Sequence, residues 1–359
     1  MFKIVSAYIY PVEMLKTSHF CPSPSIQITS HPTVSAMSSA PASFTPNASL
    51  SERRLGNPDL PPPQKKKRVV VTGGSGKLGR WMIREMVEHG WEVWNLDVSP
   101  PAPSEAKIPC KFVLCDLKDY GQVIACLSDL DSGYKGVDAV IHLAAIPSPS
   151  RAPNHVIFHT NICQTYNILE ASRVLGITNL AIASSETVFG IPFYPHPPTS
   201  LPIREDVERP ESSYSLAKLL GEKMGEQHCR WNPEAKIISI RLSNVMSPEQ
   251  YVDFEKWQDD PWVRAWNGFC YIDARDCAQA FRLAVESSLK GAHVFNIANA
   301  DNTFRVPTAE LMKKVFPDVK WEPDTQDPRE GGISIKKARE MLGFDPKYDW
   351  QSEVEKSKK

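Results

Sequence analysis

Two residues suited to proton transfer stand four positions apart in this 359-residue chain, Tyr214 and Lys218. In a helix, this spacing places the phenol and the ammonium on the same face. A free phenol loses its proton near pH ~10, but a neighbouring ammonium favours the phenolate and lowers that pKa. Tyr214 is therefore a candidate base for a substrate hydroxyl, with Lys218 as its partner. The pattern also arises on ordinary helix faces, so its weight depends on the motifs around it.

A pair of serines, Ser184 and Ser185, follows a run of apolar residues that is typical of a buried strand. A hydroxyl at the end of such a strand can stabilise a reacting C–O group as it becomes a carbonyl. We predict Ser185 to be catalytic and to contact the substrate, and Ser184 to face the structure. Glu186 comes next and is either an extra acid or base at the substrate or a loop carboxylate paired with a cation.

A glycine turn lies near the start of the ordered pattern, where residues 69–79 read VVVTGGSGKLG. A β-branched run stops at glycines and a helical pattern follows at once. Glycines lack a Cβ atom, so the backbone can turn sharply and a pyrophosphate can approach the helix start. The free N–H groups and the helix dipole then hold the phosphates. We predict a dinucleotide site formed by Gly73, Gly76, Lys77, Leu78 and Gly79.

Asp97 ends the next predicted strand, roughly twenty residues after the last glycine of the turn. A carboxylate there accepts hydrogen bonds from the adenosine ribose and repels the extra phosphate of NADP, so NAD is favoured. Asp116 and Leu117 follow the third strand and are expected at the adenine edge. His142 is expected to be a packed, hydrogen-bonded histidine. Small residues after it allow close approach of the cofactor: Leu143, Ala144 and Ala145.

Strands and helices alternate from residue 68 onward. The predicted strands are 68–72, 92–97, 111–115, 138–143, 179–184, 236–242 and 293–297. The predicted helices between them are 78–89, 120–127, 156–175, 214–231 and 276–289, and two shorter helices are predicted at 308–316 and 335–342. This alternation predicts an α/β fold with a doubly wound parallel sheet of the Rossmann type.

Three regions are predicted from composition and pattern. Residues 1–64, which are rich in serine, proline and threonine, are expected to be a disordered extension. Residues 65–245, together with 270–298, are expected to form the NAD-binding Rossmann domain. Residues 246–269 and 299–352 do not fit the alternation and are expected to form a small C-terminal substrate lobe over the carboxyl ends of the strands.

Charge and cysteine usage exclude several functional classes. Basic and acidic residues number 41 and 42, so no general attraction to nucleic acid or acidic lipid is implied. No run of about 18 apolar residues exists, so we expect no membrane partner. The eight cysteines include no C-x-x-C pair, which predicts no metal site and a reducing compartment. No signal peptide is recognisable, and we expect a cytoplasmic protein.

Taken in order along the chain, these motifs resemble the extended short-chain dehydrogenase/reductase superfamily and, within it, the NAD-dependent epimerase/dehydratase family. The resemblance covers roughly residues 68 to 350 and also includes the R-L-S-N sequence at 241–244 and the tail at 337–344. It implies that Asn161 lies near the active-site helix and binds cofactor, that Asn244 lies near the substrate, and that Tyr214 and Lys218 also contact NAD. It further implies a homodimer that pairs through the helices at 156–175 and 214–231.

Several departures from the family pattern concern the substrate. Gln164 stands where the family often has glycine, Phe189 replaces a usual tyrosine, and Met246-Ser247-Pro248 replaces Tyr-Gly-Pro. Nucleotide-sugar enzymes of the family usually carry an arginine shortly before the position of Tyr271, whereas Arg264 is the nearest basic residue here. The dehydratase sequence Thr-Asp-Glu is replaced by Ser185-Glu186-Thr187, which disfavours a dehydratase.

The sequence therefore predicts an NAD-dependent enzyme that transfers hydride at a secondary alcohol of a sugar or sugar-nucleotide. One alternative is an NAD-dependent dehydrogenase of a small free sugar or uronate. Another is a non-catalytic NAD-binding scaffold, because a fold does not fix a function. The retention of Ser185, Tyr214 and Lys218 together argues against the scaffold.

Overall fold

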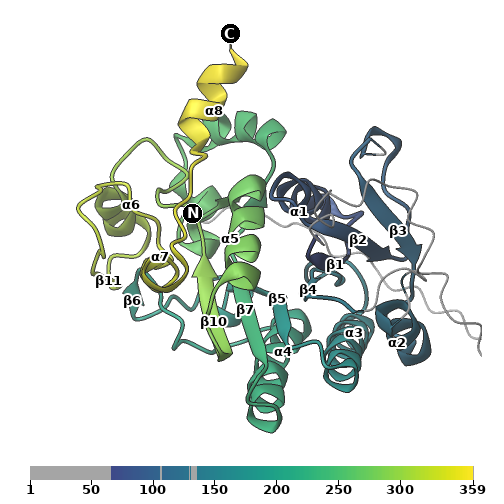
Figure 1. The fold of residues 1–359 in the computed structure, drawn as a ribbon. Coiled ribbons are helices and arrows are strands. Elements are labelled where there is room, and N and C mark those ends of the chain that lie inside the picture. Colours follow the sequence, from purple (N-terminus) through teal and green to yellow (C-terminus); the bar gives the residue numbers. More distant parts are fainter. Residues whose placement is uncertain (1–65, 106, 129, 131–135, 359) are drawn as a thin grey trace, which may run out of the picture. The chain divides into compact units, whose positions relative to one another are not determined.

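A computed structural model describes residues 66–358 of the chain, apart from 106, 129 and 131–135 (Figure 1). The extension predicted to be disordered, residues 1–64, lies outside the described residues. Among the helices of the described part, none is long and apolar enough to cross a membrane.

The central sheet has seven parallel strands in the order β10-β7-β5-β4-β1-β2-β3. The strands are β1 (Arg68–Thr72), β2 (Glu92–Asp97), β3 (Cys110–Leu114), β4 (Ala139–His142), β5 (Asn179–Ser185), β7 (Lys236–Leu242) and β10 (Gly291–Ile297). The strand order reverses between β1 and β4. In open α/β sheets, this switch point opens a crevice at the carboxyl ends of the strands.

Helices cover both faces of the sheet (Figure 1). Alternate residues of each strand point to opposite faces and so pack against opposite layers of helices. Val69 and Val71 of β1 belong to the core beneath α1 (Lys77–Glu88) and α5 (Ala274–Glu286). Val70 belongs to the core on the other face. That face is covered by α2 (Tyr120–Ser128), α3 (Asn154–Leu175) and α4 (Ser213–Trp231). The predicted Rossmann-type fold is thus confirmed.

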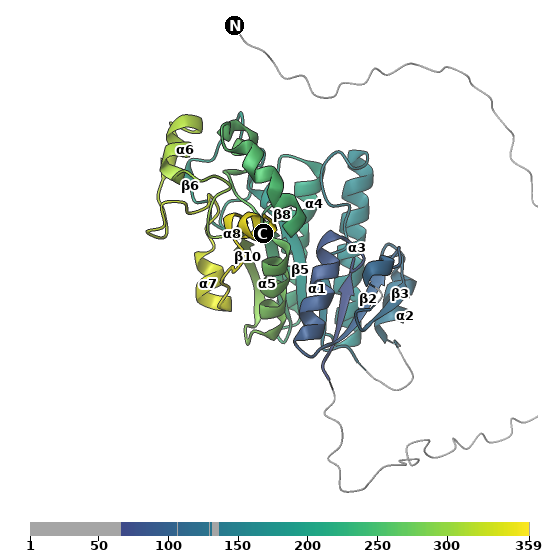
Figure 2. The ribbon, with the colours of Figure 1, turned by 90° about the horizontal axis from the view of Figure 1, so that it is seen from above.

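Helix α6 and strand β6 lie beyond the β10 edge, away from α2 and β3, as both ribbon views show (Figure 2). Two short parallel pairs form, β6 (Ser200–Leu201) with β11 (Lys320–Trp321) and β8 (Val245–Met246) with β9 (Ile272–Asp273). The short helices are η2 (Pro103–Glu105), η3 (Glu186–Phe189), η4 (Pro248–Trp257), η5 (Pro261–Asn267), α6 (Thr308–Val315), α7 (Lys336–Leu342) and α8 (Trp350–Ser357).

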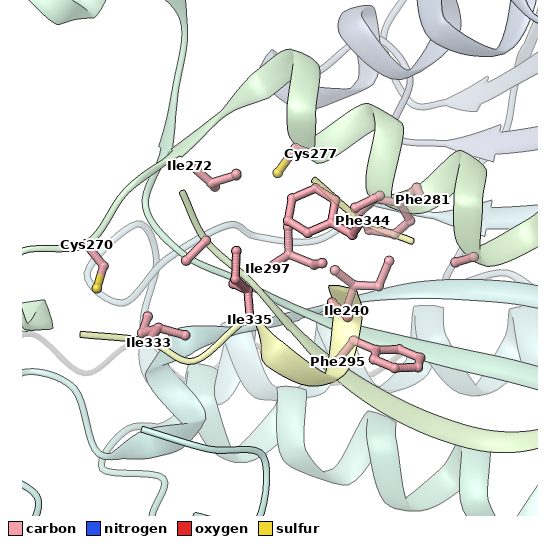
Figure 3. Packing of buried hydrophobic residues seen from close by; sticks show 14 of the residues in the cluster. Ile240, Cys270, Ile272, Cys277, Phe281, Phe295, Ile297, Ile333, Ile335 and Phe344 are labelled. Carbon is pink, nitrogen blue, oxygen red and sulfur yellow. The ribbon is translucent and has the colours of Figure 1, made fainter. Parts of the chain in front are cut away.

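The C-terminal segment shares the core of the sheet. Phe281 of α5 and Phe295 of β10 pack in one cluster with Ile333, Ile335 and Phe344 (Figure 3). Burying each of these side chains stabilises the fold by about 1.5–3 kcal/mol. The C-terminal segment is therefore anchored to the same core as the strands that carry the candidate site. The proposed division at 245/246 and 298/299 into a Rossmann domain and a substrate lobe stays a prediction.

Candidate active site

A cleft of about 1150 Å³ opens at the carboxyl ends of the strands. It lies at the switch point, between the ends of β1 and β4, and extends to the ends of β5 and β7. Its wall brings together most of the residues predicted from sequence: Gly73, Gly76, Lys77, Leu78, Gly79, Asp97, Asp116, Leu117, Leu143, Ala144, Ala145, Ser185, Glu186, Tyr214, Lys218 and Asn244. Asn161 is the predicted residue that does not line the wall.

The glycine turn has no room for side chains. Gly73 has φ +71°, and a Cβ atom there would lie 2.7 Å from the backbone nitrogen of Ala144. A Cβ atom on Gly79 would lie 2.2 Å from the carbonyl oxygen of Gly73. Helix α1 begins directly after Gly76, which caps it without any side-chain hydrogen bond. The first N–H groups of α1 thus remain open toward the cleft, as a pyrophosphate site requires.

Asp97 joins the end of β2 to the glycine turn. Its Oδ2 accepts a hydrogen bond from the backbone N–H of Ser75 at 3.0 Å, and its Oδ1 accepts one from the N–H of Ser99 at 3.2 Å. Each carboxylate oxygen has a second lone pair, so both can also accept from ribose hydroxyls. The donor set and the open helix N-terminus both fit an NAD molecule.

Farther along the wall, Asp116 is held by Lys118, whose N–H donates to Oδ1 at 3.0 Å. Leu117 is buried, and its carbonyl accepts a hydrogen bond from Asn167 at 2.9 Å. These contacts fix the segment that follows β3, where the adenine edge was predicted.

Asn161 is buried on α3 and forms hydrogen bonds with the loop that follows β4. Its side chain accepts a hydrogen bond from the N–H of Ile146 at 2.8 Å and donates one to the carbonyl of the same residue at 3.2 Å. It therefore holds the loop that begins with Ala144 and Ala145.

His142 is buried between the hydroxyls of Thr72 (2.7 Å) and Thr165 (3.2 Å), which confirms the prediction of a packed, hydrogen-bonded histidine. Burial lowers the pKa of His142 to about 3.

Tyr214 and Lys218 lie in the first two turns of α4. A capping box starts this helix, with Ser212 and Ser215 each accepting from the backbone N–H of the other. The Nζ of Lys218 lies 5.8 Å from the centre of the Tyr214 ring and donates to the carbonyl of Ala183 at 2.7 Å. Burial lowers the pKa of Lys218 to about 8, an effect that the negative charge of Glu222 opposes.

Ser185 ends β5 opposite this helix. Its Oγ accepts hydrogen bonds from the N–H and the hydroxyl of Thr187, at 3.1 and 3.0 Å. The Ser185 proton is therefore available for donation. Burial raises the pKa of Tyr214 to about 12, and a hydrogen bond with Ser185 opposes that rise. The direction is opposite to the lowering predicted from the sequence, because the cost of burying the phenolate outweighs the stabilising contacts. The three predicted catalytic side chains thus meet at the cleft.

Glu186 sits in a buried polar cluster beside them. Its Oε2 accepts from the Ser243 hydroxyl at 2.7 Å, and the amide of Asn267 donates to Oε1 at 3.3 Å. Burial raises the pKa of Glu186 to about 7, while these hydrogen bonds and the charge of Arg264 act against the rise. Arg264 donates to Asn244 Oδ1 at 3.1 Å and to the carbonyl of Cys270.

Several residues of this site were not predicted. Ser243 lies in the R-L-S-N sequence but received no role, and Asn267 belongs to no recognised motif. Arg264 was noted only for its distance from Tyr271. The aromatic residues around it, in the sequence W-V-R-A-W, could have marked it as a buried arginine, because its guanidinium stacks 4.9 Å from the Trp266 ring. Other cleft residues outside the predicted set include Ser75, Ser99, Lys118, Arg151, Thr160, Gln164 and Trp266.

Comparison with known proteins identifies the family. The model of the NAD dependent epimerase/dehydratase family matches residues 69–258, more than half of the chain. The chain belongs to this family. It is therefore an NAD-dependent enzyme of this family, as the motifs predicted.

Among curated relatives, L-arabinose 1-dehydrogenase (NAD(P)(+)) of Haloferax volcanii is 26% identical over 257 residues, or 69% of this chain and 94% of that protein. UDP-glucose 4-epimerase of Lactobacillus helveticus is 27% identical over 326 residues, or 79% and 93%. Uronate dehydrogenase of Pseudomonas putida is 31% identical over 192 residues, or 51% and 63%. Two dehydrogenases and an epimerase are thus similar in sequence to this chain at comparable identities, between 26% and 31%.

Solved structures agree on the fold. A UDP-galactose 4-epimerase is 26% identical, with a TM-score of 0.58 over 80% of this chain and 96% of that one. UDP-glucose 4-epimerase of Brucella ovis, solved in complex with NAD, is 20% identical with a TM-score of 0.59, over 80% and 96%.

Proposed function

We propose that this family member transfers hydride at a secondary alcohol of a sugar or sugar-nucleotide substrate. The observation that carries the proposal is the meeting of Ser185, Tyr214 and Lys218 on the wall of the cleft that holds the glycine turn. We assign NAD binding to the other predicted wall residues from Gly73 to Ala145, with Asn161 acting through the loop at Ile146. Glu186 and Asn244 are assigned to the substrate end.

The roles follow from the contacts. When bound, NAD⁺ supplies the hydride acceptor. Tyr214 as phenolate takes the hydroxyl proton of the substrate, and Lys218 stabilises that phenolate by its positive charge. Ser185 donates a hydrogen bond to the same substrate oxygen as it becomes a carbonyl oxygen. The proton thus ends on Tyr214.

The substrate-binding end favours a small substrate. Arg264, the nearest basic residue before Tyr271 in the sequence, is 4% exposed and is engaged by Asn244, the Cys270 carbonyl and the charge of Glu186. Its guanidinium is therefore not available at the cleft wall for a diphosphate. This observation supports the alternative function, an NAD-dependent dehydrogenase of a free sugar or uronate.

A substrate panel separates these functions. The purified chain is incubated with NAD⁺ and L-arabinose, a hexuronate, UDP-glucose or UDP-galactose. Steady NADH formation with a free sugar or uronate identifies a dehydrogenase. Interconversion of the two nucleotide sugars without net NADH identifies an epimerase. NAD binding measured by calorimetry, with no turnover across the panel, would leave the non-catalytic scaffold.

We extend the proposal to the assembly and the location of the protein. Helices α3 and α4 expose large side chains, among them Tyr166 (46% exposed) and Trp231 (57% exposed), which supports a homodimer formed by these helices. Light scattering of the purified chain tests this assembly. We further propose a cytoplasmic protein whose partner is a small-molecule substrate, without nucleic acid or membrane.

A further inference from the structure

Gln164 on α3 is buried in the wall of the cofactor cleft, and its side-chain carbonyl has no hydrogen-bond partner in the described part of the chain. Its side chain lines the cleft and is 9% exposed. Its Oε1 atom is buried and accepts no hydrogen bond from the described residues. Glycine often stands at this position in the family, so this amide is a feature of the present chain.

The backbone around Gln164 is fixed by its neighbours on the helix. Asn161 holds both backbone groups of Ile146, and Thr165 contacts the ring of His142 at 3.2 Å. Thr160, one turn earlier, also lines the cleft. Because α3 is held against the end of β4 on both sides of Gln164, the amide is held in place beside the wall formed by Leu143, Ala144 and Ala145.

An unpaired buried carbonyl of this kind destabilises a folded protein, because it has lost its hydrogen bonds with water and gained none in return. Most buried polar atoms in folded proteins have a partner, so the exception indicates a donor that occupies the cleft. The pyrophosphate of NAD offers no donor, whereas the ribose hydroxyls do, as do the amino groups at the two ends of the molecule. Along α3, Gln164 lies between Asn161, which serves the loop at Ile146, and Asn167, which serves Leu117 at the predicted adenine end.

We propose that the Gln164 amide accepts a hydrogen bond from a ribose hydroxyl of the bound dinucleotide. The inference rests on NAD binding in this cleft. It makes Gln164 a cofactor-binding residue beyond those carried by the glycine turn and Asp97. A leucine has a similar shape but no acceptor, so it separates the hydrogen bond from the packing.

Calorimetry on the apoprotein tests the proposal. Gln164→Leu should weaken NAD binding about fivefold, the effect of about 1 kcal/mol, a typical neutral hydrogen bond. Binding of ADP-ribose, which has both riboses but no nicotinamide, should weaken by the same factor. Gln351→Leu, on α8 and away from the cleft, should bind NAD like the wild type. Gln164→Ala repeats the test with a smaller side chain should the leucine fail to fold.

Unfolding of the apoproteins in urea provides the second measurement. Since Gln164→Leu removes an unpaired carbonyl, the variant should be at least as stable as the wild type while binding NAD more weakly. NAD affinities of wild type and Gln164→Leu within twofold of each other would overturn the proposal. An effect on NAD but none on ADP-ribose would refute the ribose contact. Absence of NAD binding by the wild type would instead refute the proposed function.

Discussion

The carboxylate of Glu222 accepts two hydrogen bonds from the guanidinium of Arg241, at 2.9 and 2.8 Å, and both side chains are fully buried. Glu222 lies one turn after Lys218 on α4 and also accepts from the hydroxyl of Ser184, the neighbour of Ser185. Glu222 therefore joins α4, which carries Tyr214 and Lys218, to β7 through Arg241 and to the end of β5 that carries Ser185 through Ser184.

Glu222→Gln should lower the free energy of unfolding by about 3–5 kcal/mol, because the buried charge of Arg241 loses its nearest carboxylate and keeps the more distant Glu208, at 3.8 Å. Glu226→Gln on the same helix is the matched control. Glu226 pairs with Lys223 at the surface, where both side chains are 41% exposed, and such pairs contribute about 0–1 kcal/mol. Urea unfolding measures both variants. Equal stability of the two would show that the Arg241 charge is compensated elsewhere.

The sheet was predictable because each strand is an apolar run between clear breaks. Strand β1 was predicted with its observed bounds, since its valines run from Arg68 to the first glycine. The second strand also matched, at Glu92–Asp97. Helix α8 (Trp350–Ser357) was missed because its sequence is mostly polar. It is stabilised by a tertiary contact, the burial of Trp350 against Phe254 at 5.6 Å between ring centres.

The candidate site also has a part that could be predicted from the sequence and a part that could not. Motif spacing indicated which side chains would meet at one edge, since parallel strands bring their carboxyl ends together. The placement of Arg264 could not be predicted, because η5 folds it back onto Asn244, twenty positions earlier in the chain. Nor does spacing reveal that Gln164 has a buried oxygen without a partner, since that depends on the surroundings in three dimensions.

Gly79 should be the least replaceable glycine of the turn. An alanine Cβ there would lie 2.2 Å from the Gly73 carbonyl oxygen and 2.5 Å from backbone atoms of Gly74, which have no room to move. Gly79→Ala should lower stability by about 1–3 kcal/mol and abolish NAD binding. Gly76→Ala, with the nearest atom at 3.2 Å, should do less harm.

Thermal unfolding and calorimetry rank these variants. Gly121→Ala on α2 serves as control, because its Cβ would approach only the Asp119 side chain, at 3.2 Å. NAD binding by Gly79→Ala at wild-type affinity would show that the turn tolerates a shift.

Tyr214→Phe should reduce kcat by about 10²–10⁴, because the proton acceptor is removed while the ring still fills its site. Ser185→Ala should cost about 10²–10³ in kcat by removing the donor to the developing carbonyl. Tyr194→Phe is the control, since that ring is 63% exposed and does not line the cleft. Turnover of the substrate found in the panel measures all three. A similar loss in Tyr194→Phe and Tyr214→Phe would remove Tyr214 from its assigned role.

Asp97 should set the preference for NAD over NADP. Asp97→Asn keeps an oxygen that can accept from Ser75 but removes the charge that repels a 2′-phosphate. NAD should bind about tenfold more weakly, since hydrogen bonds to charged groups contribute about 1.5–3 kcal/mol, and NADP should bind more tightly. Calorimetry with each dinucleotide measures the ratio of the NAD and NADP affinities. Asp253→Asn, at a surface pair with Lys256, should leave it unchanged.

Glu186 should give the protein a stability that falls as the pH rises. Burial raises the pKa of this carboxyl from 4.5 to about 7. Between these values, the folded protein retains a proton that the unfolded chain has released, so the free energy of unfolding decreases with increasing pH. The effect is absent below pH 4.5 and complete above about pH 7.

Glu186→Gln cannot titrate and should lack this component. The unfolding free energy of Glu186→Gln minus that of the wild type should therefore increase from pH 4.5 to about 7 and stay constant outside that window. Urea unfolding over a pH series measures the difference. Glu234→Gln removes a carboxylate that is 74% exposed, so its free energy of unfolding should change with pH as that of the wild type does. A constant difference between Glu186→Gln and the wild type at every pH would mean that Glu186 titrates alike in the folded and unfolded chains, and that the cluster with Ser243 and Asn267 holds it ionised.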